Sequence, residues 1–508
     1  NPTGGLKDSI APILVSATPN HKTVNFKAKK IKIYFDEYIK LKDVNKQLVI
    51  SPPQKNNPII SPVGTASKLI TIEILDTLDV NTTYAFNFGK SIVDNNEENE
   101  LGNFKYIFST GTYIDSLELS GEVTDPMVKK SEKELDVMLY EYNESYTDSI
   151  IFKQKPRYIS NTLDSTLYEI TNLRAGKYLL IALKDANGNK IYNPEVDKIG
   201  FVKDTITIPT DKKFNFPIFK EIPKLKVIKP KEVTKGHLIF GYLGAAKDLN
   251  INLLTATPEG FKSEFNFEKD KDTINYWYTA IEIDSLNFKV SKGEYSEEFT
   301  VKTRSSKIDS LIVKKSTSSV LHLIDTFSIS TNIPIINIDK SLIKITDQDT
   351  IAIDFNTILS KSKTKLHLNF DKKDNFKYNF ELLPKAITTI FGASNDSLAF
   401  QLTTKSPEDY GILNLELSSE KKSSFIVELL DEKGFVVRIK KIDSPQIINF
   451  ILLPPGNYSV RVTVDENNNG VWDTGDFLRR QQPEIVKYFD KEIIIRANWD
   501  EPVIFILK

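Results

Sequence analysis

Short runs of alternating apolar and polar residues fill most of the chain, and polar segments rich in Asn, Pro and Gly separate them. A period of two places every second side chain on the same face of a β-strand, so each run predicts a strand that is buried on one face. Clear examples near the start are 31–35, 70–74, 84–88 and 104–108. Helical periodicity is nearly absent, and the pattern therefore predicts an all-β protein built from antiparallel β-sandwiches.

Parts of this pattern occur twice. Residues 173–178 and 453–458 share a Leu-x-x-Gly-x-Tyr sequence, and an aspartate follows the tyrosine at the same distance in both copies. Residues 31–50 and 326–345 show a weaker similarity of the same kind. The two kinds of segment occur in the same order each time, which favours a string of repeated sandwiches over one large fold.

The chain has 508 residues, which is too long for a single compact core, since domains average roughly 150 residues and β modules are smaller. Together with the repeats, this length predicts a tandem array of domains. The predicted parts are a flexible leader at 1–9 and domains at 10–112, 113–225, 226–306, 307–405 and 406–508.

Four segments of the first predicted domain form a distinctive set, at 8–19, 31–38, 78–86 and 108–111. From the opening DSIAPILVSATP to the closing FSTG, they resemble the bacterial Ig-like domain of surface-layer proteins and of many Bacteroidota lipoproteins. The resemblance implies an Ig-like sandwich at 10–112, and the internal repeat extends it to 307–405 as a second, decayed copy.

The opening segment NPTGGLKD is polar and contains Gly and Pro, as flexible tethers do. It resembles the tail that follows the lipidated cysteine in those lipoproteins. This resemblance implies a lipid anchor preceding Asn1 and a location at the cell outer membrane, either exposed on the surface or on the periplasmic face.

The second predicted domain contains strand patterns at 117–123, 135–139 and 178–182. These resemble a transthyretin-like or carboxypeptidase-regulatory-like β-sandwich, which the repeat extends to 406–508. In that family the module is usually an accessory domain, so the resemblance implies no activity. We recognise no family in the third domain, at 226–306.

Composition narrows the possible functions. Lys and Arg together number 67 against 68 Asp and Glu, so no overall field favours nucleic acid or an anionic lipid surface. Cysteine is absent, which excludes disulfides, thiolate metal sites and thiol nucleophiles. No stretch of about 20 residues is apolar enough to span a bilayer as a helix.

One loop in the last domain has the spacing of a calcium-binding loop. Oxygen-bearing side chains stand at positions one, three, five, nine and twelve, with a glycine at six and a backbone carbonyl at seven. The alternative is a metal-free polar hairpin whose Asn and Gly residues tolerate positive φ, since the last ligand is Asp instead of Glu and strands are expected on both sides. If calcium binds, it stiffens the domain, and no other cofactor is expected. The candidate ligands are Asp465, Asn467, Asn469, Val471, Asp473 and Asp476.

An aromatic triplet in the third domain is a candidate contact for a partner. On a strand, Tyr276 and Tyr278 share one face while Trp277 points to the other, so one face could meet a protein or a glycan. The alternative is core packing.

The sequence contains no recognised catalytic motif, and its four histidines are isolated. We therefore expect no enzyme activity. The first hypothesis is an outer-membrane-anchored lipoprotein that serves as an elongated scaffold for other envelope proteins, such as an integral outer-membrane assembly or secretion complex. The alternatives are a surface glycan-binding protein of a polysaccharide-utilisation system, and an adhesion or gliding protein.

Overall fold

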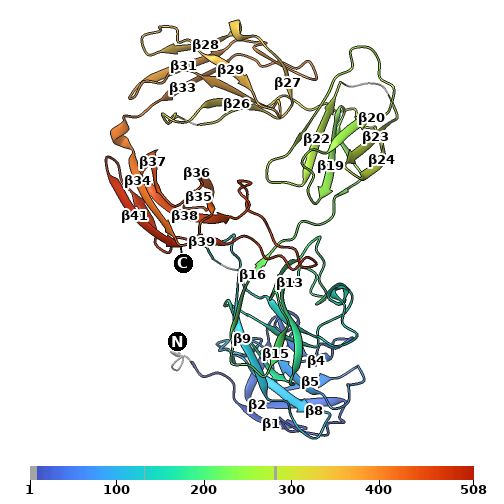
Figure 1. Ribbon diagram of the computed structural model, residues 1–508. Coiled ribbons are helices and arrows are strands. Elements are labelled where there is room, and N and C mark those ends of the chain that lie inside the picture. Colours follow the sequence, from blue (N-terminus) through green and yellow to red (C-terminus); the bar gives the residue numbers. More distant parts are fainter. Residues whose placement is uncertain (1–7, 131, 280–282, 318, 508) are drawn as a thin grey trace, which may run out of the picture. The chain divides into compact units, whose positions relative to one another are not determined.

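The computed structural model describes residues 8–130, 132–279, 283–317 and 319–507. These residues form two compact units (Figure 1). One comprises the chain up to Glu221 together with Trp472–Val486, and the other comprises Ile222–Val471 and the chain from Lys487 onward. Of the predicted leader at 1–9, only the last two residues lie within the described part.

The first domain is a sandwich of two sheets. Its elements are β1 (Leu14–Thr18), β2 (Lys30–Leu41), α1 (Val44–Gln47), β3 (Val49–Ser51), β4 (Ile59–Ser61), β5 (Ser67–Glu73), β6 (Thr83–Asn87), β7 (Ile92–Asp94) and β8 (Lys105–Ser109). One sheet has the order β1-β2-β5-β4 with β7 paired to β2, and the other has the order β3-β6-β8. Alternation along the strands sends Ile33, Ile72, Phe86 and Phe108 into the core, where each is fully buried.

The second module follows in the same unit. Its elements are β9 (Leu117–Thr124), β10 (Asp136–Glu141), the 3₁₀ turn η1 (Asp148–Phe152), β11 (Tyr158–Asn161), β12 (Leu167–Leu173), β13 (Gly176–Lys184), β14 (Lys198–Phe201), β15 (Ile206–Ile208) and β16 (Phe214–Phe219). The strands form one path, β11-β10-β13-β14-β16-β9-β12, with β15 paired to β13. The sheet folds over a core that includes Val137, Ile170, Leu180 and Ile218.

The other unit begins with two further sandwiches. The first contains β17 (Lys226–Val227), β18 (Lys231–Thr234), β19 (His237–Leu243), β20 (Asn250–Leu253), β21 (Ser263–Phe267), β22 (Thr273–Tyr278), β23 (Ser285–Lys292) and β24 (Tyr295–Lys302). The second contains β25 (Val313–Lys315), β26 (Phe327–Thr331), β27 (Ile335–Ile338), η2 (Lys340–Leu342), β28 (Ile343–Asp347), β29 (Asn356–Leu359), β30 (Lys365–Asn369), β31 (Lys377–Leu382), β32 (Ile387–Thr389) and β33 (Leu398–Thr403).

The last module contains η3 (Pro407–Asp409), β34 (Gly411–Ser419), β35 (Ser424–Asp431), β36 (Val436–Ile442), β37 (Ile447–Leu453), β38 (Gly456–Asp465), β39 (Val486–Tyr488), β40 (Ile493–Ile495) and β41 (Asp500–Leu507). One sheet has the order β37-β34-β41, and the other has the order β36-β35-β38-β39 with β40 paired to β38.

The second and last modules share one pairing scheme. The first strand of each module pairs antiparallel with the fourth and parallel with the last, as β9 does with β12 and β16, and β34 with β37 and β41. The Tyr178 hydroxyl donates to the carbonyl oxygen of Arg174 at 3.1 Å, and the Tyr458 hydroxyl donates to that of Pro454 at 2.8 Å. The repeated Gly-x-Tyr sequence therefore fixes the entry to the fifth strand of both modules.

The prediction of an all-β, tandem β-sandwich array is confirmed. Separate cores of buried apolar residues lie within 17–108, 119–218, 227–301, 321–402 and 413–507. The domain boundaries that we placed between these cores stay predictions.

Gly121 allows β9 and β16 to approach each other. A Cβ atom at this position would lie 1.9 Å from the carbonyl oxygen of Phe214, so we expect Gly121→Ala to force the parallel strands apart. Overpacking of this kind costs about 1–3 kcal/mol of unfolding free energy, which urea denaturation can measure. Gly102→Ala is the control, since nothing lies within 4 Å of a Cβ there. Equal urea midpoints for the two variants would contradict the expectation.

Candidate functional site

The predicted calcium loop begins as a turn closed by its first aspartate. Asp465 is almost fully buried, and its carboxylate accepts the backbone N–H of Asn469 at 3.1 Å and of Gly470 at 2.8 Å. In the second module, Asp185 accepts the N–H of Gly188 at 2.7 Å and of Lys190 at 2.6 Å. Both aspartates hold the same turn, so this role belongs to the module whether or not a metal binds.

The six candidate ligands do not lie in one unit. Asp465, Asn467, Asn469 and Val471 belong to the unit of the last module, whereas Asp473 and Asp476 belong to the unit of the first two domains. Asp476 accepts the N–H of Arg479 at 2.9 Å and pairs with the guanidinium of that residue. In the described part of the chain, no group of three or more His, Cys, Asp or Glu side chains is placed to hold a metal ion. Calcium binding stays a prediction.

The second half of the loop is part of a segment that packs on the second module. We call Trp472–Val486 the strap. Asp476 and Gln481 exchange two backbone hydrogen bonds of 2.9 Å each, which closes the strap into a tight turn. A Cβ atom at Gly475 would lie 2.4 Å from the ring of Phe219, so only glycine fits where the strap crosses this ring.

Phe477 is the centre of the strap's contact and is completely buried. Its ring meets that of Phe201 edge-on, with ring centroids 5.4 Å apart and an interplanar angle of 86°. Its backbone N–H donates to the carboxylate of Glu221, whose other oxygen accepts the Tyr192 hydroxyl at 2.5 Å. Burial, and then this hydrogen bond, raise the pKa of Tyr192 well above its ordinary range, so the hydroxyl stays protonated and donates.

Arg480 forms the second contact of the strap. Its guanidinium lies 4.4 Å from the ring centroid of Phe477 and donates to the carboxylate of Asp148 and to the Tyr146 hydroxyl. Burial raises the pKa of Tyr146 to about 12, and its hydrogen bond to Asp148 acts in the same direction. Arg480 thus covers the ring of Phe477 and links it to polar groups of the second module.

Two backbone carbonyls of the second module also accept hydrogen bonds from the strap. The Thr474 hydroxyl donates to the carbonyl oxygen of Lys220 at 2.7 Å, and the Gln482 amide donates to that of Phe201 at 2.9 Å. The strap thus combines a buried aromatic anchor with polar contacts on either side of it.

The sequence contains an indirect sign of the strap. We interpreted 178–182 as an alternating strand, yet all six residues from 178 to 183 are apolar and buried. A continuous apolar run indicates a strand covered on both faces. The equivalent strand β38 alternates strictly, as YSVRVTV. The difference predicts that an additional segment covers the second module, but it does not identify that segment.

The aromatic triplet is buried. Tyr276, Trp277 and Tyr278 are between 2% and 3% exposed. Trp277 packs in a small cluster with Ile333 and Ile390 of the neighbouring sandwich in the same unit. None of the three rings presents a surface to a partner, so the structure gives them the packing role that we considered as the alternative.

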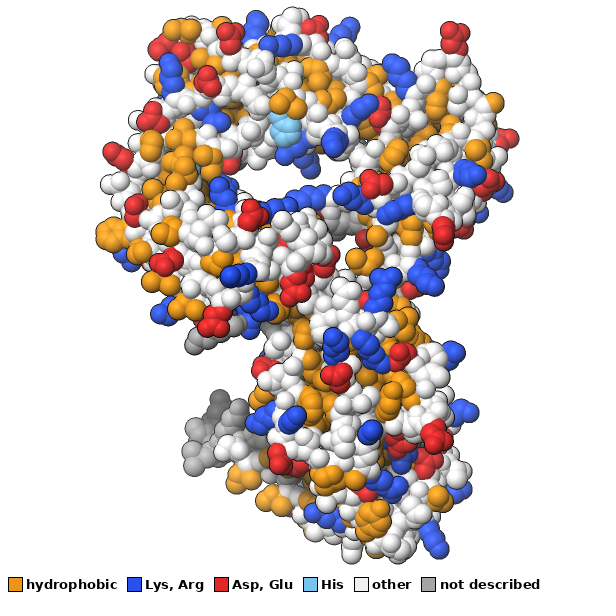
Figure 2. Space-filling view, in the orientation of Figure 1, with side chains coloured by type: hydrophobic (Ala, Val, Ile, Leu, Met, Phe, Trp, Pro, Cys, Tyr) orange, Lys and Arg blue, Asp and Glu red, His pale blue; other side chains and the backbone are white. Residues whose placement is uncertain are grey.

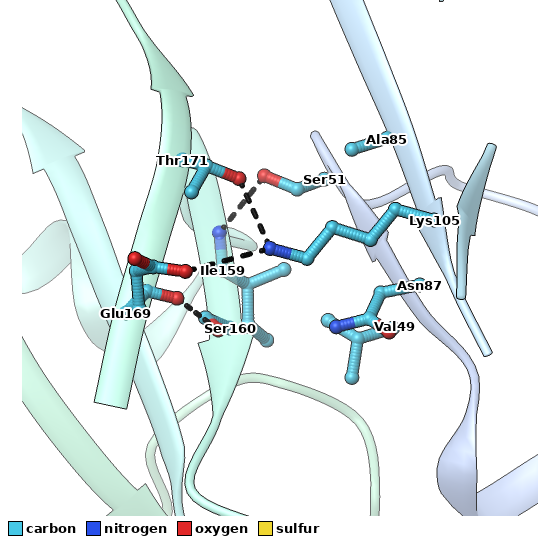
Figure 3. A pocket seen from close by; sticks show the side chains of 9 residues that line it. All are labelled: Val49, Ser51, Ala85, Asn87, Lys105, Ile159, Ser160, Glu169 and Thr171. Carbon is cyan, nitrogen blue, oxygen red and sulfur yellow. Dashed lines mark hydrogen bonds and ion pairs between the residues drawn. The ribbon is translucent and has the colours of Figure 1, made fainter. Parts of the chain in front are cut away.

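A small cavity lies where the first domain meets the second module, within one unit (Figure 3). Its lining residues are Val49, Ser51, Ala85, Asn87, Lys105, Ile159, Ser160, Glu169 and Thr171. The Lys105 ammonium reaches across to the Thr171 hydroxyl at 3.3 Å and to the Glu169 carboxylate at 3.8 Å. The volume is about 20 Å³, enough for about one water molecule. This place is therefore a polar joint between domains.

Residues 8–110 match the family model of the bacterial Ig-like domain. A comparison with curated proteins gave no match. Among solved structures, the chain is similar to domains 1–6 of the surface layer protein SbsC, at 12% identity over 96% of this chain and 67% of that one, with a TM-score of 0.16. It is also similar to BcpA, the major pilin subunit of Bacillus cereus, at 12% identity over 77% of this chain and 99% of that one, with a TM-score of 0.14.

The anchoring of the strap can be tested with two neighbouring residues. We expect Phe477→Ala to lower the unfolding free energy of the unit that contains the second module by about 3–5 kcal/mol, because it empties a buried aromatic site. Leu478→Ala is the control, since Leu478 is 62% exposed. Urea denaturation with hydrogen exchange at 179–183 measures both effects. A small and equal change in the two variants would show that the strap contributes little stability.

The calcium prediction has a separate test. Calcium is expected to raise the unfolding temperature of the last module relative to the chain in chelator, and Asp465→Asn is expected to lose this rise because it removes a charged ligand. Scanning calorimetry measures the shift, with magnesium as the ionic control. An unchanged unfolding temperature in calcium would leave Asp465 with its role in the turn alone.

Proposed function

We propose that the protein is a non-catalytic scaffold of the cell envelope that binds other envelope proteins. The observation that carries this proposal is the strap, which packs on the second module and forms part of the cover of β13. A scaffold must hold its binding surfaces at defined positions, and the buried ring of Phe477 fixes the strap on the second module. The match of residues 8–110 to a bacterial Ig-like domain is consistent with a role of this kind.

The location that we propose is the outer membrane, through a lipid anchor preceding Asn1. It is supported by the resemblance of the opening segment to lipoprotein tails. No helix in the described residues is long and apolar enough to cross a membrane. Detection of a lipid-modified cysteine directly before Asn1 in the native protein tests the anchor.

The partner that we propose is an integral outer-membrane complex that assembles or secretes proteins. Glycan binding has less support, because the aromatic triplet that motivated it is buried. Adhesion or gliding would use the same architecture and would differ only in the partner.

Affinity purification from native membranes tests this function. We expect the tagged chain to recover an integral outer-membrane protein in a constant ratio, and we expect Phe477→Ala to reduce recovery several-fold because it releases the strap. Leu478→Ala should recover as much as the native chain. Recovery of no integral membrane protein, after chemical cross-linking in intact cells, would contradict the proposal.

A further inference from the structure

The last strand of the chain is an apolar edge. In the described residues, β41 has β34 as its strand partner and forms one border of its three-stranded sheet. Ile504 and Ile506 point away from the core and are 62% and 60% exposed. Ile447 on the opposite border strand is 65% exposed, and Figure 2 shows hydrophobic side chains gathered over this sheet.

The equivalent strand of the second module has a neighbour on this side. There β16 pairs antiparallel with β14, with Phe219 opposite Ile199 and Ile218 opposite Gly200. In the last module β39 occupies the position of β14 in chain order, yet within the described residues it pairs with β38 and not with β41. The repeat therefore shows which side of β41 has no strand among the described residues, and in the second module that side carries an antiparallel strand.

From Val503 onward, β41 lacks the features that usually protect an edge. Edge strands avoid association through charged residues, proline, bulges or short length, and β41 has Asp500, Glu501 and Pro502 only at its start. The stretch from 502 to 507 reads PVIFIL and carries no charge, and β41 pairs with β34 over eight consecutive residues without a register shift. An edge of this kind is a template for another strand.

Pro502 indicates which backbone groups face outward. Proline cannot donate to a ladder, so within a strand its nitrogen faces the open side. Residues two apart direct their backbone groups to the same side. The N–H and C=O groups of Ile504 and Ile506 therefore point away from β34, and their side chains lie on the exposed face.

We propose that β41 pairs antiparallel with β41 of a second copy of the chain, about a two-fold axis. In this register Ile504 lies opposite Ile506 of the partner subunit, and each such pair exchanges both backbone hydrogen bonds. The pairing joins the two three-stranded sheets into one. It does not depend on the envelope partners proposed above.

Self-pairing suits this strand for two reasons. A two-fold axis generates an antiparallel pair, which is the orientation that β14 adopts beside β16. The uncharged stretch brings no like charges opposite each other, and the four isoleucines cover one another on one face.

Pro502 ends the ladder because it has no N–H. The contact is small, so the dimer forms only at high concentration.

The absence of cysteine from the chain allows a register-specific test. Directly opposite residues have Cα atoms about 5.5 Å apart, within disulfide reach, whereas diagonal ones lie about 7–8 Å apart. We therefore expect a mixture of Ile504→Cys and Ile506→Cys chains to form several-fold more disulfide-linked dimer than either variant alone. Equal yields in all three samples would overturn the proposed register.

Sedimentation velocity tests the association itself. We expect the sedimentation coefficient of the native chain to rise with concentration, and Ile504→Lys to abolish this rise. Ile439→Lys is the control, because Ile439 is 53% exposed on β36 in the other sheet. A native chain that stays monomeric at every concentration overturns self-pairing and leaves the edge to a strand of a different protein.

Discussion

Burial of the outer face of β13 is the constraint on which the first unit depends. Leu179, Ile181 and Leu183 point away from the main core of the second module, and each is about as buried as a core residue. Burying one such side chain contributes about 1.5–3 kcal/mol, and leaving it in water forfeits that free energy. The second module therefore needs a cover on this face. The strap supplies part of that cover, and it comes from more than 250 residues further along the chain.

The strap lies in a loop that both related modules have, so the two loops can be compared in length. In the second module, Asp185 accepts the N–H of Gly188, and the N–H of Val202 donates to the carbonyl oxygen of Leu180. Val202 follows Asp185 by 17 residues. The equivalent Phe489 follows Asp465 by 24 residues. The loop of the last module is thus seven residues longer, although it begins with the same aspartate turn. Despite the extra length, β35 pairs antiparallel with β38 as β10 does with β13.

The periodic parts of the structure could be predicted from the sequence. The alternation of apolar and polar residues predicted the strands, and the repeated Gly-x-Tyr sequence identified the two related modules. Both signals could be recognised because each lies within a short stretch of neighbouring residues. The strap could not be located in this way, since the pocket for Phe477 is built from Phe201, Tyr192 and Glu221, which are distant in sequence. Likewise, the spacing at 276–278 predicted that the tryptophan points to the opposite face of the strand from the two tyrosines. It could not show that both faces of this strand are covered.

The joints in the first unit differ in what stabilises them. Between the first domain and the second module, Lys90 pairs with Asp164 at 2.6 Å and Arg157 with Asp79 at 3.1 Å, and all four side chains are partly in water. Exposed ion pairs contribute about 0–1 kcal/mol each, so these pairs orient the joint more than they stabilise it. The strap instead buries Phe477 completely. The strap is therefore held on the second module mainly by burial, whereas the ion pairs between the first two domains weaken as ionic strength rises.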